Sequence, residues 1–271
     1  MAGSAGAESK KMNNNWEPIS KKSHIGIGIK QRPNFLEFGD KPIIPISTFE
    51  LKAAITCLPV VFAKQGNKFQ LVGLFGVQKN SNLFVNSNGE WHLDFLPSIL
   101  RLGPFALGNI RDGKFIVFLD KNSPQVVSQS DGFRIFTEDG NETEFFRANL
   151  EILENIKRSN TFIETIGDLL LEADLMEAFS IKAQNGNDEE TSLPKLWRVN
   201  IDKFTGLNDE TFLKLRKAKA LEIIYGHLYS MFCITKLQRM LKIRAQADAQ
   251  MKNLGDKIFD DGEPPLEFDF S

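Results

Sequence analysis

Few side chains in this sequence could carry acid–base chemistry, and histidine is the first type to consider. His24 lies in a polar N-terminal stretch, and His92 follows Trp91 just after a turn. Asp94 stands two residues after His92, and in a strand this spacing places both side chains on one face. A histidine beside a carboxylate can act as an acid, a base or a metal ligand. A surface hydrogen bond is the alternative interpretation.

His227 stands out because it lies within the most apolar helical stretch of the chain. A buried imidazole needs a hydrogen-bond partner or a ligand to offset its desolvation. Neither Lys219 nor Glu222 has the spacing of three or four residues that would place it beside His227. Tyr225 and Tyr229 flank the histidine instead. Two interpretations remain open: a core histidine whose hydrogen bonds are satisfied, or a histidine that contacts a pocket or a partner.

Arg101 precedes a Gly-Pro-Phe turn that ends at Phe105. Its planar guanidinium group is suited to grip a carboxylate. That carboxylate could be internal, with Asp94 and Asp120 as candidates, or it could belong to a ligand. We expect Trp91, Arg101 and Phe105 to line an apolar cleft between a sheet and the helices.

The chain lacks the common catalytic and nucleotide-binding motifs. Gly26-Ile27-Gly28 has no third glycine and no preceding strand, so a flexible arm is the simpler interpretation. The sequence has no Walker loop, no Gly-x-Ser-x-Gly elbow and no closely spaced group of Cys and His. We therefore single out no catalytic residue, no metal site and no cofactor.

The last residues interleave acids with apolar side chains and contain a pair of prolines. Such a composition cannot fold alone, but it can dock its rings into a basic groove or add a strand to a partner. A solubilising tail is the alternative interpretation. The candidate docking residues are Phe259, Leu266, Phe268 and Phe270.

The elements that would position these residues change in type along the chain. Between about residues 59 and 137, short runs rich in Val, Ile and Phe alternate with turn signals, which is typical of antiparallel strands. Asp112-Gly113 is expected to close a hairpin between Phe105 and Leu119. The expected strands are Val60–Ala63, Phe69–Val77, Leu83–Val85, Phe105–Ile110, Phe115–Leu119, Phe133–Thr137 and Leu196–Ile201.

The second half of the chain is expected to be mainly helical. Apolar residues at helical spacing predict a helix over Glu144–Arg158, and a capping-box pattern at Thr161 predicts the start of a second helix. Leu175–Ile181 is expected to form a third short helix. Asn208 is expected to cap a long helix that runs to about Arg244 and is buried at its centre.

Composition places the chain among ordinary globular proteins and excludes some functions. It has 271 residues, a hydrophobic content of 42% and a formal net charge of -2, which argues against nucleic-acid binding over the whole surface. Cys57 and Cys233 lie in apolar runs, as expected for two reduced, buried thiols. We expect no membrane span and no signal peptide, so the predicted location is the cytoplasm.

The order of several segments resembles a known family. Residues 69–108 contain an Asn-Leu-Phe-Val step, a tryptophan after a turn and a closing Arg-Leu-Gly-Pro-Phe. Further matching segments are Phe118–Val126, Gly132–Phe136, Trp197–Asp202 and Ile223–Met231. Together they resemble the bacterial SapC-like proteins from about Ile43 to Ile243. The resemblance implies an association with surface-layer loci and with neighbouring TonB-dependent receptors and tryptophan-halogenase-like flavoproteins, and it supplies no catalytic residue.

We therefore predict an α+β protein in which a bent, mostly antiparallel sheet (about 59–137 plus 196–201) packs against a helical C-terminal half. The expected organisation is a flexible arm (1–40), one SapC-like domain (41–244) and a charged tail (245–271). The expected function is recognition of a peptide or partner protein by a non-catalytic accessory protein. One alternative is an enzyme or enzyme subunit that acts with a flavin-dependent partner, with His92, Asp94, Arg101 and His227 as its candidate residues. The other is a structural component of a surface layer. The sequence leaves the oligomeric state open.

Overall fold

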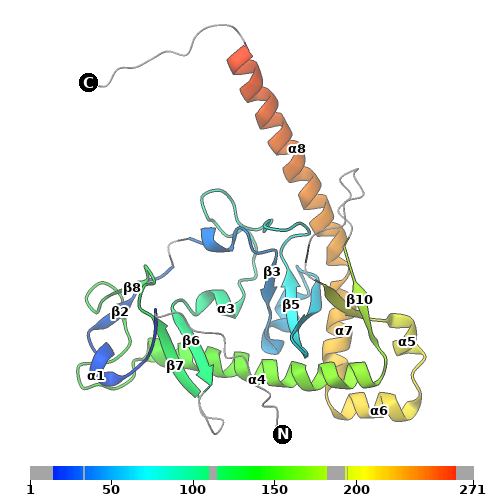
Figure 1. Ribbon diagram of the computed structural model, residues 1–271, viewed down its shortest axis with the longest axis horizontal. Helices are drawn as coiled ribbons and strands as arrows, with labels where there is room; N and C mark the ends of the chain where they lie inside the picture. The colour runs from blue at the N-terminus through cyan, green and yellow to red at the C-terminus, as the bar shows by residue number, and fades with distance from the viewer. Residues whose placement is uncertain (1–14, 33, 110–114, 182–192, 194, 261–271) are drawn as a thin grey trace, which may run out of the picture.

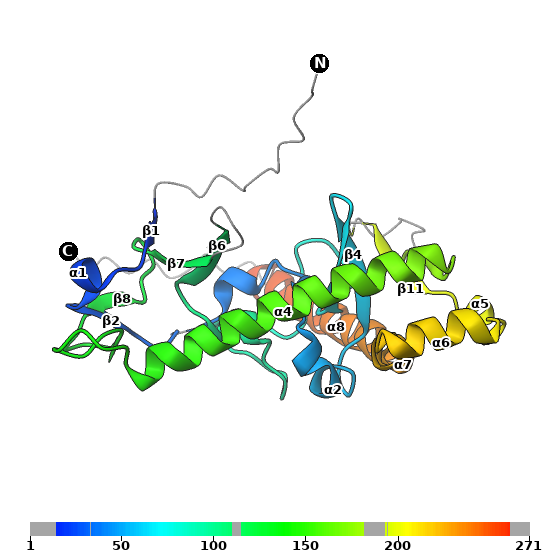
Figure 2. The same cartoon turned by 90° about the horizontal axis from the view of Figure 1, so that it is seen from below.

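The structure is a computed structural model that describes residues 15–32, 34–109, 115–181, 193 and 195–260. Within these residues the strands pair antiparallel in three sheets, and long helices pack along and beyond them (Figures 1 and 2). The α+β class is confirmed. The strands form three separate sheets instead of one continuous bent sheet.

The largest sheet has five strands in the order β10-β11-β4-β5-β3. Its centre is the hairpin of β4 and β5, in which Val60 pairs with Gly73 and Gln65 with Lys68. Gly66 has a φ of 61°, which the tight turn requires and a glycine adopts without strain. The strands are β3 (Ile43–Pro45), β4 (Val60–Gln65), β5 (Lys68–Leu74), β10 (Met176–Phe179) and β11 (Leu196–Val199).

The second sheet has three strands in the order β1-β7-β6. The predicted pairing of Phe105 with Leu119 is confirmed, while the turn predicted at Asp112-Gly113 lies outside the described residues. The strands are β1 (Trp16–Pro18), β6 (Phe105–Asn109) and β7 (Phe115–Asp120).

The third sheet, in the order β8-β2-β9, corrects the expectation for the N-terminal region. Its strands are β2 (Ile27–Ile29), β8 (Val126–Ser128) and β9 (Phe133–Arg134). A Cβ atom added at Gly28 would stand 2.6 Å from the backbone oxygen of Ser128, so the absence of a side chain at Gly28 permits the close approach of β2 and β8. Residues 15–32 therefore contribute strands to two sheets, whereas a loosely held arm was expected through residue 40.

Helix α4 (Glu144–Glu172) is one continuous helix, so the prediction of a second helix starting at Thr161 was wrong. Thr143 caps it as an N-cap, accepting a hydrogen bond from the Phe146 backbone. Buried residues recur along its whole length and contact both hydrophobic cores, Leu153 in one and Ile166 in the other. This continuous packing outweighs the local capping signal.

The chain reverses after α4 and adds a strand where a short helix was predicted. Asp174 has a φ of 53° and ends the helix, and β10 then pairs Met176 with Val199 of β11. The residue types in this segment favour a helix, but pairing at the sheet edge decides its conformation. Leu83–Val85, a predicted strand, forms only an isolated bridge between Val85 and Trp91.

Three helices, α6 to α8, follow Asn208 in the described residues instead of one long helix, and the short helix α5 precedes it. Asn208 caps α6 as predicted, by accepting a hydrogen bond from the Thr211 backbone. Lys219, with a φ of 60°, separates α6 from α7. The helices are α5 (Ile201–Thr205), α6 (Asp209–Lys217), α7 (Ala220–Ser230) and α8 (Cys233–Asp260).

Helix α8 leaves the body of the molecule and extends well past the predicted end near Arg244 (Figure 1). Among its described side chains Leu237 and Leu241 are buried, and Arg244 donates a hydrogen bond to the Asn82 carbonyl. Residues 245–260, predicted as part of a tail, are therefore helical.

Short helical turns complete the fold: α1 (Lys21–His24), α2 (Leu51–Ala54), α3 (Ser98–Arg101) and the 3-10 turns η1 (Leu36–Phe38) and η2 (Thr48–Glu50).

Candidate functional site

His227 is a buried structural residue that joins α7 to two strands. Its Nδ1 lies 2.7 Å from the Val60 carbonyl oxygen, and the Val199 backbone N–H donates to Nε2 at 3.1 Å. These contacts define a neutral imidazole that donates from Nδ1 and accepts at Nε2. The pKa of His227 is lowered from 6.5 to about 4, mainly by burial; the hydrogen bond to Val60 opposes this shift and the charge of Arg198 contributes to it. The interpretation of His227 as a satisfied core histidine is therefore the one that the geometry supports.

Ser230 reinforces the same junction. Its hydroxyl accepts a hydrogen bond from the Val60 backbone N–H at 2.9 Å and lies 2.6 Å from the His227 carbonyl. Both side chains are completely buried. Together they fix one face of α7 against β4 and so determine which face of the helix is left outside.

The outward face of α7 carries aromatic side chains that remain exposed. Tyr225 is 39% exposed, Tyr229 is 62% exposed, and Phe232, just after the helix, is 81% exposed. The two tyrosine rings stack with centroids 6.1 Å apart. The sequence had predicted a helix buried on nearly every side, and the structure corrects that for this face.

These rings line one wall of a groove of about 700 Å³, which we call the α7 groove. The other wall comes from the end of β11 and the start of α5. Tyr225 and His227, both singled out from the sequence, line it. The remaining lining residues are Glu177, Arg198, Val199, Asn200, Ile201, Asp202, Leu228, Tyr229, Met231 and Phe232.

The polar wall of the α7 groove is internally paired. Arg198 Nε donates to Glu177 Oε1 at 2.5 Å, and Asn200 Nδ2 donates to Glu177 Oε2 at 2.5 Å. The hydrogen bond from Arg198 is the main cause that holds the pKa of Glu177 below its ordinary value. The groove therefore presents an ionised carboxylate and a guanidinium group side by side, next to an aromatic face.

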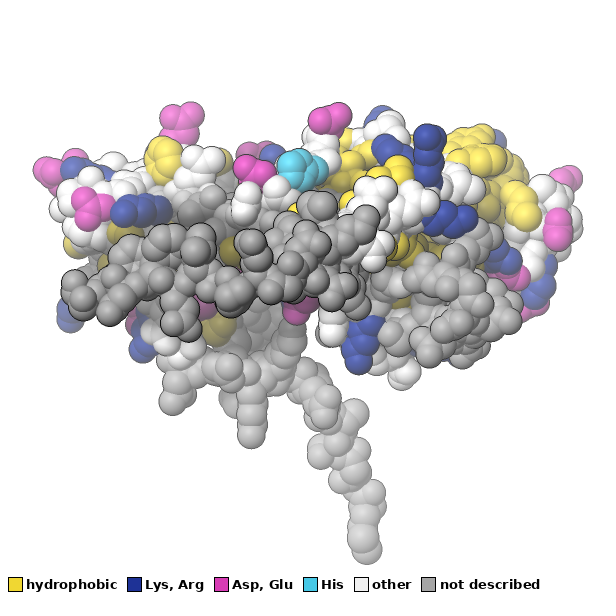
Figure 3. Space-filling model, turned by 90° about the horizontal axis from the view of Figure 1, so that it is seen from above, with side chains coloured by type: hydrophobic (Ala, Val, Ile, Leu, Met, Phe, Trp, Pro, Cys, Tyr) yellow, Lys and Arg dark blue, Asp and Glu magenta, His cyan; other side chains and the backbone are white. Residues whose placement is uncertain are grey.

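In Figure 3 hydrophobic side chains gather toward the right-hand end, which is the end of α5, α6 and α7 in Figure 1. Acidic and basic side chains are scattered over the rest of this face.

The predicted pair of His92 and Asp94 does not form. The segment is not a strand, the His92 side chain is 56% exposed, and its ion-pair partner is Glu90, 3.7 Å away. Trp91 beside it is a packing residue, because its Nε1 donates to the Phe95 carbonyl at 3.0 Å. The geometry therefore supports the surface interpretation of His92, but the neighbouring carboxylate is that of Glu90 instead of Asp94.

Arg101 binds neither of the carboxylates predicted for it. Its guanidinium group donates to Ser98 Oγ at 2.8 Å, and Ser98 in turn donates to Glu50 from both its hydroxyl and its backbone N–H. Asp120 instead accepts a hydrogen bond from the Asn122 backbone, as expected of a turn residue.

Trp91 and Phe105 also belong to different cores. The Trp91 ring packs on Phe35 and Phe75 in the core of the five-stranded sheet, whereas Phe105 packs on Phe145 and Phe146 of α4. These residues therefore do not share the cleft that the sequence suggested.

Glu50 is a structural residue that the sequence interpretation missed. It is 6% exposed, and its carboxylate accepts hydrogen bonds from the backbones of Ser47 and Ser98. The spacing of Ser47 and Glu50 is a capping-box pattern, which is the signal that identifies it. Glu50 thus joins η2 to α3 across the core.

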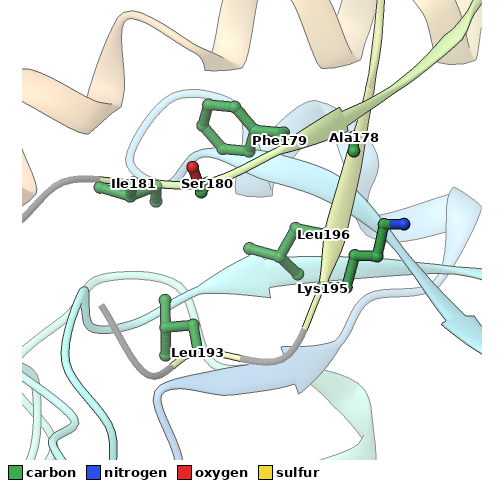
Figure 4. Close-up of a pocket in the computed structure, with 7 residues that line it drawn as sticks. All are labelled: Ala178, Phe179, Ser180, Ile181, Leu193, Lys195 and Leu196. Carbon is green, nitrogen blue, oxygen red and sulfur yellow. The ribbon is translucent and has the colours of Figure 1, made fainter. Parts of the chain in front are cut away.

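A smaller hollow of about 170 Å³ lies at the far end of β10 and β11 (Figure 4). Phe179, Ile181, Leu193 and Leu196 surround it, and the Lys195 ammonium group points away from Leu193 and Ile181. It adjoins residues 182–192, which lie outside the described part of the chain, and we assign it no role.

The described residues show which metal-binding groups, free thiols and membrane-spanning helices the fold contains. No group of three or more His, Cys, Asp or Glu side chains there could hold a metal ion. Cys57 and Cys233 are free and partly buried, and burial raises the pKa of each thiol. In that same part of the chain, every helix is too short or too polar to span a bilayer.

Of the predicted docking residues in the tail, Phe259 falls in the last turn of α8. Leu266, Phe268 and Phe270 lie outside the described residues.

Fold and groove together define an α+β protein with antiparallel sheets and an exposed aromatic groove. A SapC family model matches residues 19–237, and the chain therefore belongs to the SapC family. The match begins well before Ile43, where the resemblance had been placed, and it includes β2 of the third sheet. No curated protein and no solved structure matches the chain.

Proposed function

We propose that this protein is a non-catalytic accessory protein that recognises a peptide segment of a partner protein in the α7 groove, within a bacterial surface or nutrient-uptake system. The observation that carries the proposal is the exposure of Tyr225, Tyr229 and Phe232 on one wall of that groove. Contiguous exposed apolar side chains are typical of interaction surfaces.

The composition of the groove suits a peptide more than a small charged metabolite. Aromatic residues supply most of the energy at protein interfaces, above all where a polar rim excludes water around them. Glu177 and Arg198 provide such a rim with both signs of charge. The preferred occupant is an apolar side chain flanked by polar groups, inserted between the tyrosines and the β11–α5 junction.

The enzymatic alternative has no supporting geometry at the residues proposed for it. Both ring nitrogens of His227 are hydrogen-bonded within the fold, and its pKa of about 4 leaves it neutral at ordinary pH. His92 and Arg101 do not line the α7 groove with it. The family association makes a tryptophan-halogenase-like flavoprotein one candidate partner, and the role as a surface-layer component stays a prediction.

The test is site-specific photo-crosslinking in an extract of the source organism. A photoreactive phenylalanine analogue replaces Tyr229, and a second chain carries it in place of Phe49, which is 49% exposed and lies outside the α7 groove. We expect position 229 to crosslink one defined peptide that position 49 does not. Mass spectrometry then identifies the partner and the crosslinked residue.

A pull-down with substituted chains provides the second readout. The double substitution Tyr229→Ala and Phe232→Ala should abolish retention of the crosslinked partner in a pull-down, while Phe49→Ala should leave it unchanged. Because all three side chains are about half exposed or more, none of these changes should prevent folding. Equal retention by the double variant and the control would reject the α7 groove as the binding site.

A further inference from the structure

The three-stranded sheet of β1, β7 and β6 has a free edge at β6. In the described residues β6 pairs only with β7, which pairs with β1 on its other side. The Asp120 N–H donates to the Pro104 carbonyl, so Pro104 and Asp120 form a hydrogen-bonded pair. From this pair onward, hydrogen-bonded and non-hydrogen-bonded pairs alternate along β6 and β7. Phe105 and Leu107 are therefore the residues whose backbone N–H and C=O groups point away from β7.

This edge opens into a groove of about 580 Å³ between β6 and α4, which we call the β6 groove. Its apolar surface includes Ile99, Leu107 and Ile156. Its charged side chains are Lys157, which lies over the Phe115 ring, and the ion pair of Lys68 and Glu164, whose atoms are 2.6 Å apart; Lys157 therefore carries the positive charge that this pair does not neutralise. An edge strand beside a helix, with apolar walls and lysines, is a site to which an extended peptide can add as a strand.

The peptide that fits these walls alternates apolar and acidic residues. In an extended strand, alternate side chains point to opposite faces, so such a peptide offers one apolar face and one negative face. The chain itself contains this pattern at Leu266-Glu267-Phe268-Asp269-Phe270. We propose that residues 266–270 of a second copy of this chain bind in the β6 groove as an added antiparallel strand, so that two copies exchange these segments.

A second copy is required because the segment cannot reach its own groove. Helix α8 ends at Asp260 on the opposite side of the molecule from α4 and β6 (Figure 1). Between Arg244, which donates a hydrogen bond to the Asn82 carbonyl, and Asp260 the helix rises about 24 Å. Residues 261–265 extend at most about 17 Å, which is less than the distance that the helix has covered.

The test uses the full chain and a chain that ends at Asp260. Sedimentation velocity over a range of concentrations should show reversible self-association of the full chain and a monomer for the shortened chain. A synthetic peptide with the sequence of residues 261–271 should bind the shortened chain, measured by fluorescence anisotropy. A peptide of the same composition with Leu266, Phe268 and Phe270 made consecutive should not bind.

Two substitutions place the peptide at β6. Leu107→Pro removes an outward N–H from an edge strand, where proline is tolerated, and should weaken peptide binding about tenfold or more. Lys157→Glu should weaken binding most at low salt. Circular dichroism of both variants verifies the fold. A full chain that stays monomeric overturns the proposal, as does peptide binding that neither substitution weakens, while the Phe232→Ala change in the α7 groove should leave this self-association intact.

Discussion

The neutral state of His227 predicts a specific loss of stability in acid. In the folded chain its pKa is about 4, and in the unfolded chain it returns to about 6.5. Between these values the unfolded chain binds more protons than the folded chain, so the free energy of unfolding decreases as the pH falls. The contribution is intact above about pH 6.5 and is lost progressively toward about pH 4.

The structure gives the magnitude. A separation of about 2.5 units corresponds to a total loss of about 3 kcal/mol, of which about 2 kcal/mol is lost by about pH 5. The burial of His227 and the positive charge of Arg198 both favour the neutral imidazole, so the shift has two physical sources.

The assay is urea denaturation of the wild-type chain and of His227→Gln at a series of pH values. Glutamine does not titrate, while every other ionisable group is common to both chains, so the difference between the two curves isolates His227. We expect that difference to shrink as the pH falls, because only the wild-type chain loses this contribution. Parallel curves from about pH 7.5 to about pH 5 would refute the assignment of a buried, neutral His227.

Two further pairs of variants test the packing on which the grooves depend. Glu50→Ala leaves the buried backbone N–H groups of Ser47 and Ser98 without an acceptor and should lower the free energy of unfolding by about 2–4 kcal/mol. Arg101→Ala is the control: because Arg101 is exposed, it should lower the free energy of unfolding by less than about 1 kcal/mol in the same urea denaturation assay. Gly28→Ala forces a Cβ against the backbone of β8 and should lower the melting temperature clearly, while Gly26→Ala, with nothing within 4 Å, should not; equal melting temperatures for the two glycine variants would contradict the described pairing of β2.

The sequence predicted best those elements whose signals are local. The pairing of Phe105 with Leu119 follows from a hairpin pattern, and the cap at Asn208 follows from the polar residues at a helix start. Both depend on neighbouring residues alone. The SapC resemblance is also confirmed, and it rests on the order of many such local segments along the chain.

The failures have one physical origin, which is packing between residues far apart in sequence. Thr161 carries a capping pattern, but α4 contacts a core on each side of it and continues as one helix. Met176 lies in a helix-favouring segment, yet pairing with Val199 makes it a strand. Arg101 was matched to carboxylates near in sequence, while the network that binds it centres on Glu50, 48 residues from Ser98.

The same dependence explains why the candidate site could be named only in part. The stretch from Leu221 to Ile234 is apolar on nearly every side, which led to the prediction of a central buried helix. The positions of β4, β11, α2 and α6 decide which side is covered, and the hydrogen bonds of His227 and Ser230 hold that side against the two strands. Tyr229 and Phe232 are the apolar surplus that these elements leave exposed. Exposed aromatic side chains beside a paired polar rim are typical of a surface that binds another protein, and this surplus is therefore the strongest indication of function that the fold provides.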